Sequence, residues 1–189
     1  WQALHRAIYP IVLLGCVLVF RDVTEKHKVQ QKLQWQAGHD ALTGLPNRLL
    51  LADRFGRAID KARRCGSLLA VCVLDLDQFK PINDSYGHET GDRLLVQVTE
   101  RLLQNLRGID TLCRLGGDEF VILFEDVEDE LALQIPLGRI LESLSSPFPL
   151  DDHLITVSAS IGVTVYPSDN SDADTLIRHA DQAMYLAKQ

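Results

Sequence analysis

The sequence predicts an α/β protein of the α+β type, with a central mixed, largely antiparallel sheet flanked by helices. Two observations support this fold class. Apolar runs typical of buried strands alternate along the chain with segments whose apolar residues recur at helical spacing. In addition, Gly116 and Gly117 stand between two apolar runs, a turn signal that predicts a hairpin and therefore antiparallel neighbours in the sheet.

The N-terminal part predicts a strand followed by a linker helix. Residues 8–20, IYPIVLLGCVLVF, are apolar but shorter than the roughly 20 residues that a membrane-spanning helix needs. Their β-branched residues and Gly15 favour a buried strand. Residues 25–38 are polar apart from a thin apolar seam, which predicts a coiled-coil-like helix that can pair two chains. A solvated linker helix is the alternative. The seam consists of Val29, Leu33 and Ala37.

The next elements are a capped helix, a strand and a second helix. Asn47 is placed to cap a helix that Gly66 ends. Residues 67–77, SLLAVCVLDLD, predict a buried strand that runs into acids. A loop containing Gly and Asn then leads to a helix from about Glu89 to Leu106.

The remaining chain adds the hairpin, two more helices and a strand. The hairpin strands are expected at 111–114 and 120–124, and the last strand at 154–166. Helices are expected at 130–144 and 173–188. This order mixes hairpin and crossover connections, which favours a mixed sheet covered by helices.

Composition and charge exclude two classes of partner. The 189 residues are 46% hydrophobic and 24% charged, and the formal net charge is −7. Nucleic acids and anionic membranes attract clustered Lys and Arg, so we expect neither nucleic acid nor direct membrane contact for this chain. The cysteines show no metal-binding spacing, which favours reduced thiols in a cytoplasmic protein. They are Cys16, Cys65, Cys72 and Cys113.

Carboxylates stand at the ends of two predicted strands. Asp75 and Asp77 are expected on one strand face with Leu76 buried between them, while Asp118 and Glu119 occupy the hairpin turn. If the strands are neighbours, three or four carboxylates converge and require a counter-ion. Such hard oxygen ligands suit Mg²⁺ or Mn²⁺, in a two-metal arrangement that activates a hydroxyl. Solvated turn acids explain either pair alone, whereas the two pairs together favour a metal.

The loop QFKPINDSYGHETGD, residues 78–92, offers groups for phosphate and for a base. Backbone amides near Phe79 and Lys80 can cradle a triphosphate, with Lys80 adding charge. Asn83 and Asp92 suit a guanine edge, whose two donors a carboxylate accepts, whereas adenine presents an acceptor there. Gly87 and Gly91 allow close approach of the chain. Each of these signals is weak alone.

Five segments taken together resemble the GGDEF domain of diguanylate cyclases. They are DALTGLPNR (40–48), DLDQFKPINDSYGHETGD (75–92), RLGGDEF (114–120), SIGV (160–163) and ADQAMYLAK (180–188). The resemblance places this domain at residues 39–189. It implies a fold similar to nucleotide cyclases and polymerase palms. It also implies that two GTP condense to cyclic di-GMP with release of two pyrophosphates.

The resemblance also implies roles for individual residues. The implied metal ligands, for two Mg²⁺ or Mn²⁺ ions per active site, are Asp75, Asp118, Glu119 and the carbonyl of Leu76. The implied substrate-binding residues are Asn83 and Asp92 for guanine, and Phe79, Lys80 and Lys188 for phosphate. The implied catalytic set is Asp118, Glu119 and Lys80. Each domain of this family holds one GTP, so catalysis implies a homodimer whose two sites face each other.

Two further segments resemble regulatory parts of such proteins. RGID, residues 107–110, resembles the RxxD inhibitory site, where Arg107 and Asp110 bind the product, and Arg139 is a candidate second arginine. A surface ion pair between Arg107 and Asp110 is the alternative. Residues 1–24 resemble the closing strand of a PAS sensor domain, so we expect the chain to start inside a longer regulatory protein. The sequence leaves open whether that protein is anchored in a membrane. At its other end the chain stops one residue after Lys188, where the family continues into a Gly-Arg-containing tail.

Two other functions stay open. A non-catalytic GGDEF module binding GTP or cyclic di-GMP as a signalling receptor is one, although residues 116–120 are intact. A cyclase for another nucleotide is the other, and Asn83 and Asp92 speak against adenine.

Overall fold

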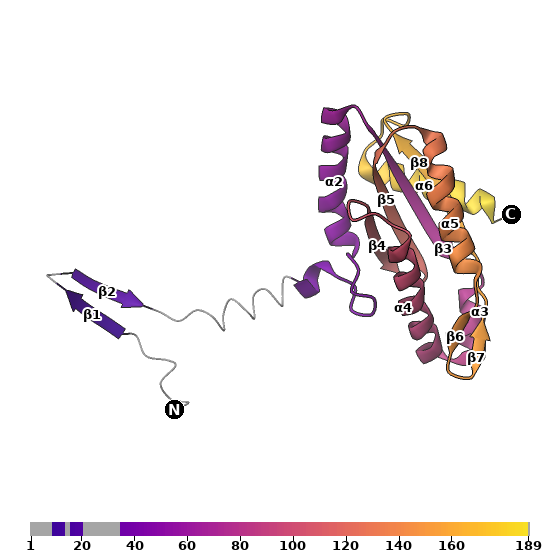
Figure 1. Cartoon of the computed structure of the whole chain (residues 1–189), viewed down its shortest axis with the longest axis horizontal. Helices are drawn as coiled ribbons and strands as arrows, with labels where there is room; N and C mark the ends of the chain where they lie inside the picture. Colours follow the sequence, from indigo (N-terminus) through magenta and orange to yellow (C-terminus); the bar gives the residue numbers. More distant parts are fainter. Residues whose placement is uncertain (1–8, 14–15, 21–34, 189) are drawn as a thin grey trace. The chain divides into compact units, whose positions relative to one another are not determined.

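The computed structural model describes residues 9–13, 16–20 and 35–188 (Figure 1). The chain divides into two units, residues 1–37 and 38–189. In the first unit, β1 (Tyr9–Leu13) and β2 (Cys16–Phe20) pair antiparallel, with Tyr9 opposite Phe20. The single strand expected over residues 8–20 is therefore wrong. Two short strands instead satisfy each other's backbone groups.

The linker helix expected over 25–38 falls largely outside the described residues. Residues 35–38 are helical, and the seam residues Val29 and Leu33 lie in the undescribed part. Residues 1–8 and 21–24 of the PAS-like prediction lie there too.

The second unit contains one main sheet and five α-helices among its described residues. In chain order the elements are α2 (Arg48–Cys65), β3 (Leu68–Leu76), α3 (Phe79–Tyr86), α4 (His88–Gln104), β4 (Thr111–Gly116), β5 (Glu119–Val127), the 3₁₀ turn η2 (Glu130–Leu133), α5 (Gln134–Ser145), β6 (Phe148–Leu150), β7 (His153–Ile155), β8 (Ala159–Tyr166) and α6 (Ala173–Ala187). The main sheet has the order β4-β5-β3-β8. Every pairing in it is antiparallel, and the predicted fold class of a largely antiparallel sheet flanked by helices is confirmed.

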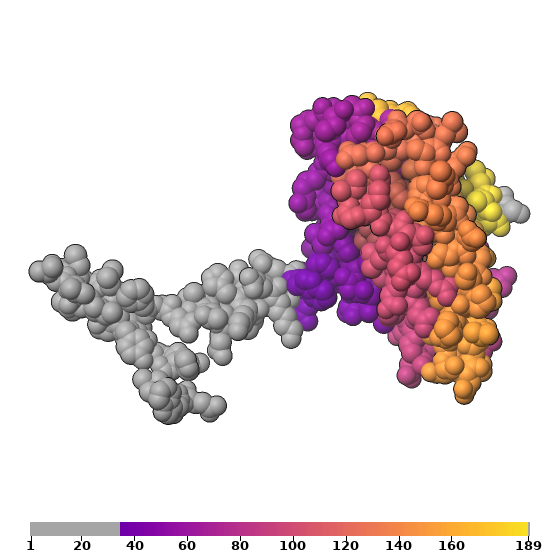
Figure 2. All heavy atoms as spheres, viewed as in Figure 1, coloured from indigo at the N-terminus to yellow at the C-terminus, as the bar shows by residue number. Residues whose placement is uncertain are grey.

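The central strand β3 separates two hydrophobic cores because its side chains alternate between the sheet's faces. Ala70, Cys72 and Leu74 face the core that α4 and α5 cover, and Figure 2 shows these two helices side by side. The intervening residues Leu69, Val71 and Val73 face the second core, formed with α2 and α6. By the same alternation, the next residue of this second set is Asp75, which therefore projects from the face that α2 and α6 cover.

The ends of α2 confirm the sequence prediction. The Asn47 side chain accepts hydrogen bonds from the amides of Leu49 and Leu50, at 3.0 and 3.2 Å. Gly66 closes the helix in the left-handed conformation at φ 68°, which glycine adopts without steric cost.

Two segments differ from expectation. Residues 79–86, expected as loop, form α3, because the buried Phe79 ring anchors a segment too short to show clear periodicity. The strand expected over 154–166 is divided into β7 and β8, since the turn at Asp151, with φ 51°, folds β7 back onto β6. Among the described residues, none of the helices is long and apolar enough to cross a membrane.

Candidate active site

The two acid-bearing strand ends are neighbours. Asp75, near the end of β3, lies directly opposite Glu119, the first residue of β5. Glu119 shares its sheet face with Val121 and Leu123, which pack in the core beneath α2 and α6. Asp75 and Glu119 therefore project from the same face, as expected for carboxylates that share a site.

The hairpin turn brings Asp118 beside this pair. β4 and β5 are joined by Gly117 and Asp118, and Gly117 adopts φ 54°, the left-handed region that favours glycine. Burial raises the pKa of Asp118, and the nearby charge of Asp75 raises it further. Burial also raises the pKa of Glu119, with added repulsion from Asp75 and Asp181. The turn thus concentrates more negative charge than its surroundings neutralise, which favours a bound cation.

Lys188 reaches this group from the C-terminal end of α6. Its Nζ contacts Asp75 Oδ1, although the sequence assigned it to a nucleotide phosphate. The Asp75 side chain is 17% exposed and that of Lys188 is 31% exposed, so the pair is partly shielded from water. In this structure Lys188 neutralises a predicted metal ligand.

Asp77 was expected to converge with Asp75, and its carboxylate is engaged with residues of the neighbouring chain segment. The backbone pairing continues past the end of β3, because the Asp77 amide donates to the Ser158 carbonyl at 2.8 Å. The Asp77 carboxylate accepts hydrogen bonds from the hydroxyls of Ser158 and Ser160, at 2.7 and 2.8 Å. Asp77 therefore fixes the end of β3 against β8. Leu76, by contrast, is buried as expected.

The donor set fits a hard divalent cation in its chemistry. Asp75, Asp118 and Glu119 supply carboxylate oxygens, and Leu76 can supply a carbonyl, which are the ligand types that Mg²⁺ and Mn²⁺ prefer. Within the described part of the chain, no three His, Cys, Asp or Glu side chains are already gathered around one point. The residues can hold a metal, but the carboxylates must move together to do so.

The predicted phosphate loop is the start of α3. Gln78 turns the chain there with φ 58°, and its side chain makes no capping hydrogen bond to the helix. Helix N-termini present amides and a positive dipole end to anions. Lys80 is exposed beside them, while the Phe79 ring is buried. The backbone and the lysine are therefore available to a phosphate, and the Phe79 side chain serves packing.

The predicted base residues lie where α3 meets α4. A Cβ atom on Gly91 would lie 1.8 Å from Asn83 Oδ1 and 3.3 Å from the Phe79 ring. The absence of a side chain at Gly91 therefore makes room for the Asn83 amide. Asp92, the next residue, is exposed. The close approach that the sequence assigned to Gly91 is confirmed, whereas a Cβ atom on Gly87 would meet no atom within 4 Å. Gly87 instead adopts φ 85°, a backbone conformation that favours glycine.

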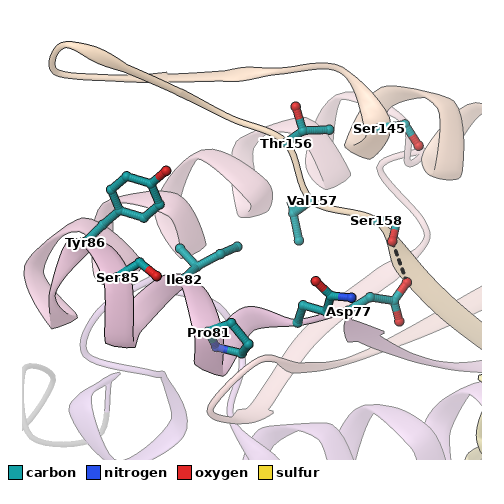
Figure 3. Close-up of a pocket in the computed structure, with 10 residues that line it drawn as sticks. Asp77, Pro81, Ile82, Ser85, Tyr86, Ser145, Thr156, Val157 and Ser158 are labelled. Carbon is teal, nitrogen blue, oxygen red and sulfur yellow. Dashed lines mark hydrogen bonds between the residues drawn. The ribbon is translucent and has the colours of Figure 1, made fainter.

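A pocket of about 390 Å³ lies beside a different face of α3 (Figure 3). Ile82 and Tyr86 of α3 line it with Val157, and the hydrogen bond from Ser158 to Asp77 closes one end. Asp77, which the sequence grouped with the candidate metal-binding carboxylates, belongs to its lining, whereas the residues predicted to bind guanine or phosphate do not.

Arg114 ties the hairpin to the segment that precedes α2. Arg114 is 9% exposed, and its Nη1 donates to the Asp40 carboxylate at 2.8 Å. Its Nε and Nη2 both donate to the Gly117 carbonyl oxygen, at 3.0 and 2.7 Å. Burial alone would raise the pKa of Asp40, but hydrogen bonds from Thr43 and Arg114 lower it overall. Asp40 and Arg114 stand in the motifs DALTGLPNR and RLGGDEF, but no local pattern in the sequence predicts their contact.

Two more charged residues were missed. Asp181 of α6 raises the pKa of Glu119 and Arg48 of α2 lowers it, although burial is the larger cause of the net rise. Arg48 stands in the motif DALTGLPNR and Asp181 in ADQAMYLAK, and membership of these motifs was the sequence signal for a role at the site.

Arg107 and Asp110 lie in the turn before β4 and bind each other. Arg107 donates to the Asp110 carboxylate through its amide, Nε and Nη2, at 2.8, 3.2 and 2.9 Å. The Arg107 side chain is 54% exposed, that of Asp110 1%. Both residues line a cavity of about 230 Å³ to which Arg139 also contributes. The structure thus places the candidate second arginine at the same cavity.

Comparison with known proteins matches this arrangement to one family. Residues 37–189 match the family described as diguanylate cyclase, GGDEF domain. The chain is 44% identical over 165 residues to the bifunctional diguanylate cyclase/cyclic di-GMP phosphodiesterase MucR of Pseudomonas aeruginosa. The aligned region covers 87% of this chain and 24% of MucR. It spans about a quarter of the length of the curated relatives it matches.

Two solved structures share the fold. A sensory box/GGDEF family protein from Caulobacter crescentus CB15 matches with a TM-score of 0.76 at 42% identity, over 80% of this chain and 97% of that chain. The coiled coil and GGDEF domain of DgcB from Caulobacter crescentus, in complex with c-di-GMP, matches with a TM-score of 0.80 at 25% identity, over 88% of each chain. On this evidence, the chain belongs to the GGDEF-domain family of diguanylate cyclases.

Proposed function

We propose that this domain is an active diguanylate cyclase, which condenses two GTP into cyclic di-GMP and releases two pyrophosphates. The observation that carries the proposal is the placement of Asp75 opposite Glu119, with Asp118 in the adjoining turn. The raised pKa values of Asp118 and Glu119 support it, because they indicate a site with unbalanced negative charge.

Asp75, Asp118, Glu119 and the Leu76 carbonyl would hold Mg²⁺ or Mn²⁺, two ions per active site. When bound, such ions supply positive charge that offsets the charge of the triphosphate and of the attacking oxygen. The start of α3 and Lys80 bind the phosphates and orient the α-phosphate for attack.

The reaction itself is a substitution at phosphorus. The 3′-oxygen of one GTP bonds to the α-phosphorus of the other, the bond to the β-phosphate oxygen breaks, and pyrophosphate leaves. A carboxylate of Asp118 or Glu119 close to the 3′-hydroxyl accepts its proton.

Asn83 and Asp92 select guanine. Asp92 is exposed at the first turns of α4, where its carboxylate can accept from the two donors of a guanine edge. Adenine would leave Asp92 facing an acceptor, and a polar group left unpaired rejects the wrong base.

Catalysis takes place in a homodimer, because each domain holds one of the two nucleotides. The predicted helix over 25–38 would raise the effective concentration of the second site. Product inhibition is proposed at the cavity shared by Arg107 and Arg139, whose guanidinium groups can bind phosphate or a guanine edge.

The test is incubation of the chain with Mg²⁺ and either GTP or ATP, followed by chromatographic identification of cyclic dinucleotides. We expect cyclic di-GMP from GTP and no product from ATP. Binding of GTP without any product would favour the alternative, a non-catalytic module that acts as a receptor.

A further inference from the structure

We infer that Lys188 acts as a resident cation that occupies Asp75 until the nucleotide arrives, and so delays metal binding until GTP is present. This inference deepens the proposed function and rests on it. It assigns Lys188 a second partner besides phosphate, and it predicts an order of binding for the metal.

The contact that carries the inference joins two elements of the second unit. Lys188 follows the last turn of α6, and Asp75 stands near the end of β3. α6 lies against β8 because Gly162 has no side chain; a Cβ there would come within 2.0 Å of the Ala180 carbonyl oxygen and 2.2 Å of the Met184 amide nitrogen. This close packing brings the end of α6, and with it Lys188, to the strand next to β8.

Lys188 is distinguished from the other cations around the site by this contact. Arg114 is committed to Asp40 and to the Gly117 carbonyl. The Lys80 side chain makes no hydrogen bond or ion pair in the part of the chain that the structure describes. Lys188 alone among these three touches a predicted metal ligand.

The contact must weaken metal binding in two ways. The Asp75 Oδ1 lone pairs that meet the ammonium group are not free to coordinate a second cation. In addition, a divalent ion placed beside a charged lysine is repelled, and the repulsion is substantial where water screens the charges incompletely.

The nucleotide reverses this balance. A triphosphate bound at the start of α3 offers Lys188 more negative charge than one carboxylate does, and its flexible four-carbon side chain can follow that charge. Movement of Lys188 to the phosphates then frees Asp75 for the metal that accompanies GTP. Lys188 thus competes with the metal before nucleotide binding and assists the nucleotide afterwards.

The experiment measures binding of Mn²⁺ alone, in the absence of nucleotide, from the decrease of the free Mn²⁺ electron paramagnetic resonance signal. We expect the Lys188→Met chain to bind Mn²⁺ about tenfold or more tightly than the wild type. Lys188→Arg, which keeps the charge, should retain the weak binding of the wild type. Asp75→Asn introduced into the Lys188→Met chain should abolish the gain.

Lys80→Met is the matched control, because it removes one positive charge near the same site without breaking a contact to Asp75. It should change Mn²⁺ affinity by less than about twofold. An equal gain in Lys80→Met and Lys188→Met would overturn the inference, since any nearby charge would then suffice.

Two other outcomes separate the inference from the proposed function. If Lys188→Met binds Mn²⁺ no better than the wild type while the wild type converts GTP to cyclic di-GMP, the inference is wrong and the proposed function stands. If no variant binds Mn²⁺ and the wild type forms no product, both are wrong.

Discussion

Arg114 and Asp40 are 74 residues apart in the sequence, yet the guanidinium group of Arg114 donates to the Asp40 carboxylate at 2.8 Å. The same guanidinium group donates to the Gly117 carbonyl, so the hairpin turn is braced against the segment before α2. This brace fixes the turn that carries Asp118 and leads into Glu119.

Loss of the contact between Arg114 and Asp40 should lower both the free energy of unfolding and the rate of product formation. Asp40→Ala leaves a buried guanidinium group without its anionic partner, for which we expect a decrease of about 2 kcal/mol in the free energy of unfolding. Urea denaturation measures it. Asp53→Ala is the control, because Asp53 pairs with Arg57 on the exposed surface of α2 and should matter by less than about 0.5 kcal/mol. Equal effects of the two substitutions would contradict a role for the brace.

Glu119→Ala should abolish cyclic di-GMP formation, by at least about a hundredfold, while the fold remains intact. Glu119 is only partly buried at the start of β5 and belongs to neither hydrophobic core, so its truncation creates no cavity. Product is measured by chromatography and the fold by circular dichroism. Retained turnover in a folded variant would show that this carboxylate is not required.

The raised pKa of Asp118 predicts a pH-dependent stability. Burial, and then the charge of Asp75, raise the pKa of Asp118 in the folded chain. Protonated Asp118 therefore contributes fully to the stability of the fold below the pKa of the unfolded chain, and this contribution is lost as pH rises through the pKa of the folded chain. Asp118→Asn cannot ionise, so it does not lose this stability at high pH. With chelator present, we expect it to raise Tm at pH 7, on the order of 2 °C, with the difference shrinking as pH falls toward about 4. A difference that grows in acid would contradict the assignment.

Two glycine substitutions should have opposite consequences. Gly91→Ala meets the end of the Asn83 side chain, which can rotate away, so we expect the fold to persist and the KM for GTP to rise. Gly162→Ala meets the backbone of α6, which cannot yield locally, so we expect a large loss of Tm. Thermal unfolding and initial-rate kinetics on both variants test the contrast. An unchanged KM in Gly91→Ala would show that Asn83 does not contact the base.

Arg107→Ala and Arg139→Ala should each relieve product inhibition with little change in initial rate, because both side chains line one cavity. Rates measured with increasing added cyclic di-GMP provide the test. Arg178→Ala on the exposed face of α6 is the control and should leave inhibition unchanged. Undiminished inhibition in Arg107→Ala would mean that the product binds elsewhere.

Local patterns predicted the elements that have strong local signals. The Asn47 cap, the Gly66 stop and the hairpin at Gly117 follow from backbone preferences within a few residues, and the structure has all three. α3 was missed because eight residues containing Pro81 and Asn83 resemble a turn in isolation. Its stability comes from the burial of Phe79, which is a tertiary effect.

The site was predictable where strand geometry decides it and unpredictable where distant side chains do. Alternation along the strand predicted the face of Asp75, and the hairpin predicted the turn that carries Asp118 and Glu119. The pairing of β3 with β5, which places Asp75 opposite Glu119, was a condition of the prediction and comes from the structure. The serine contacts of Asp77 and the contact of Lys188 with Asp75 join residues more than 80 positions apart, and no spacing rule foretells them.

The most direct test of the account is the rate of cyclic di-GMP formation against added Mg²⁺, measured on chelator-treated wild type and on Asp75→Asn. The account predicts no product without Mg²⁺, a saturable rise as Mg²⁺ is added, and loss of that rise in Asp75→Asn. Product formation without a divalent cation, or a wild-type response in Asp75→Asn, would contradict the claim that these strand-end carboxylates hold the metal.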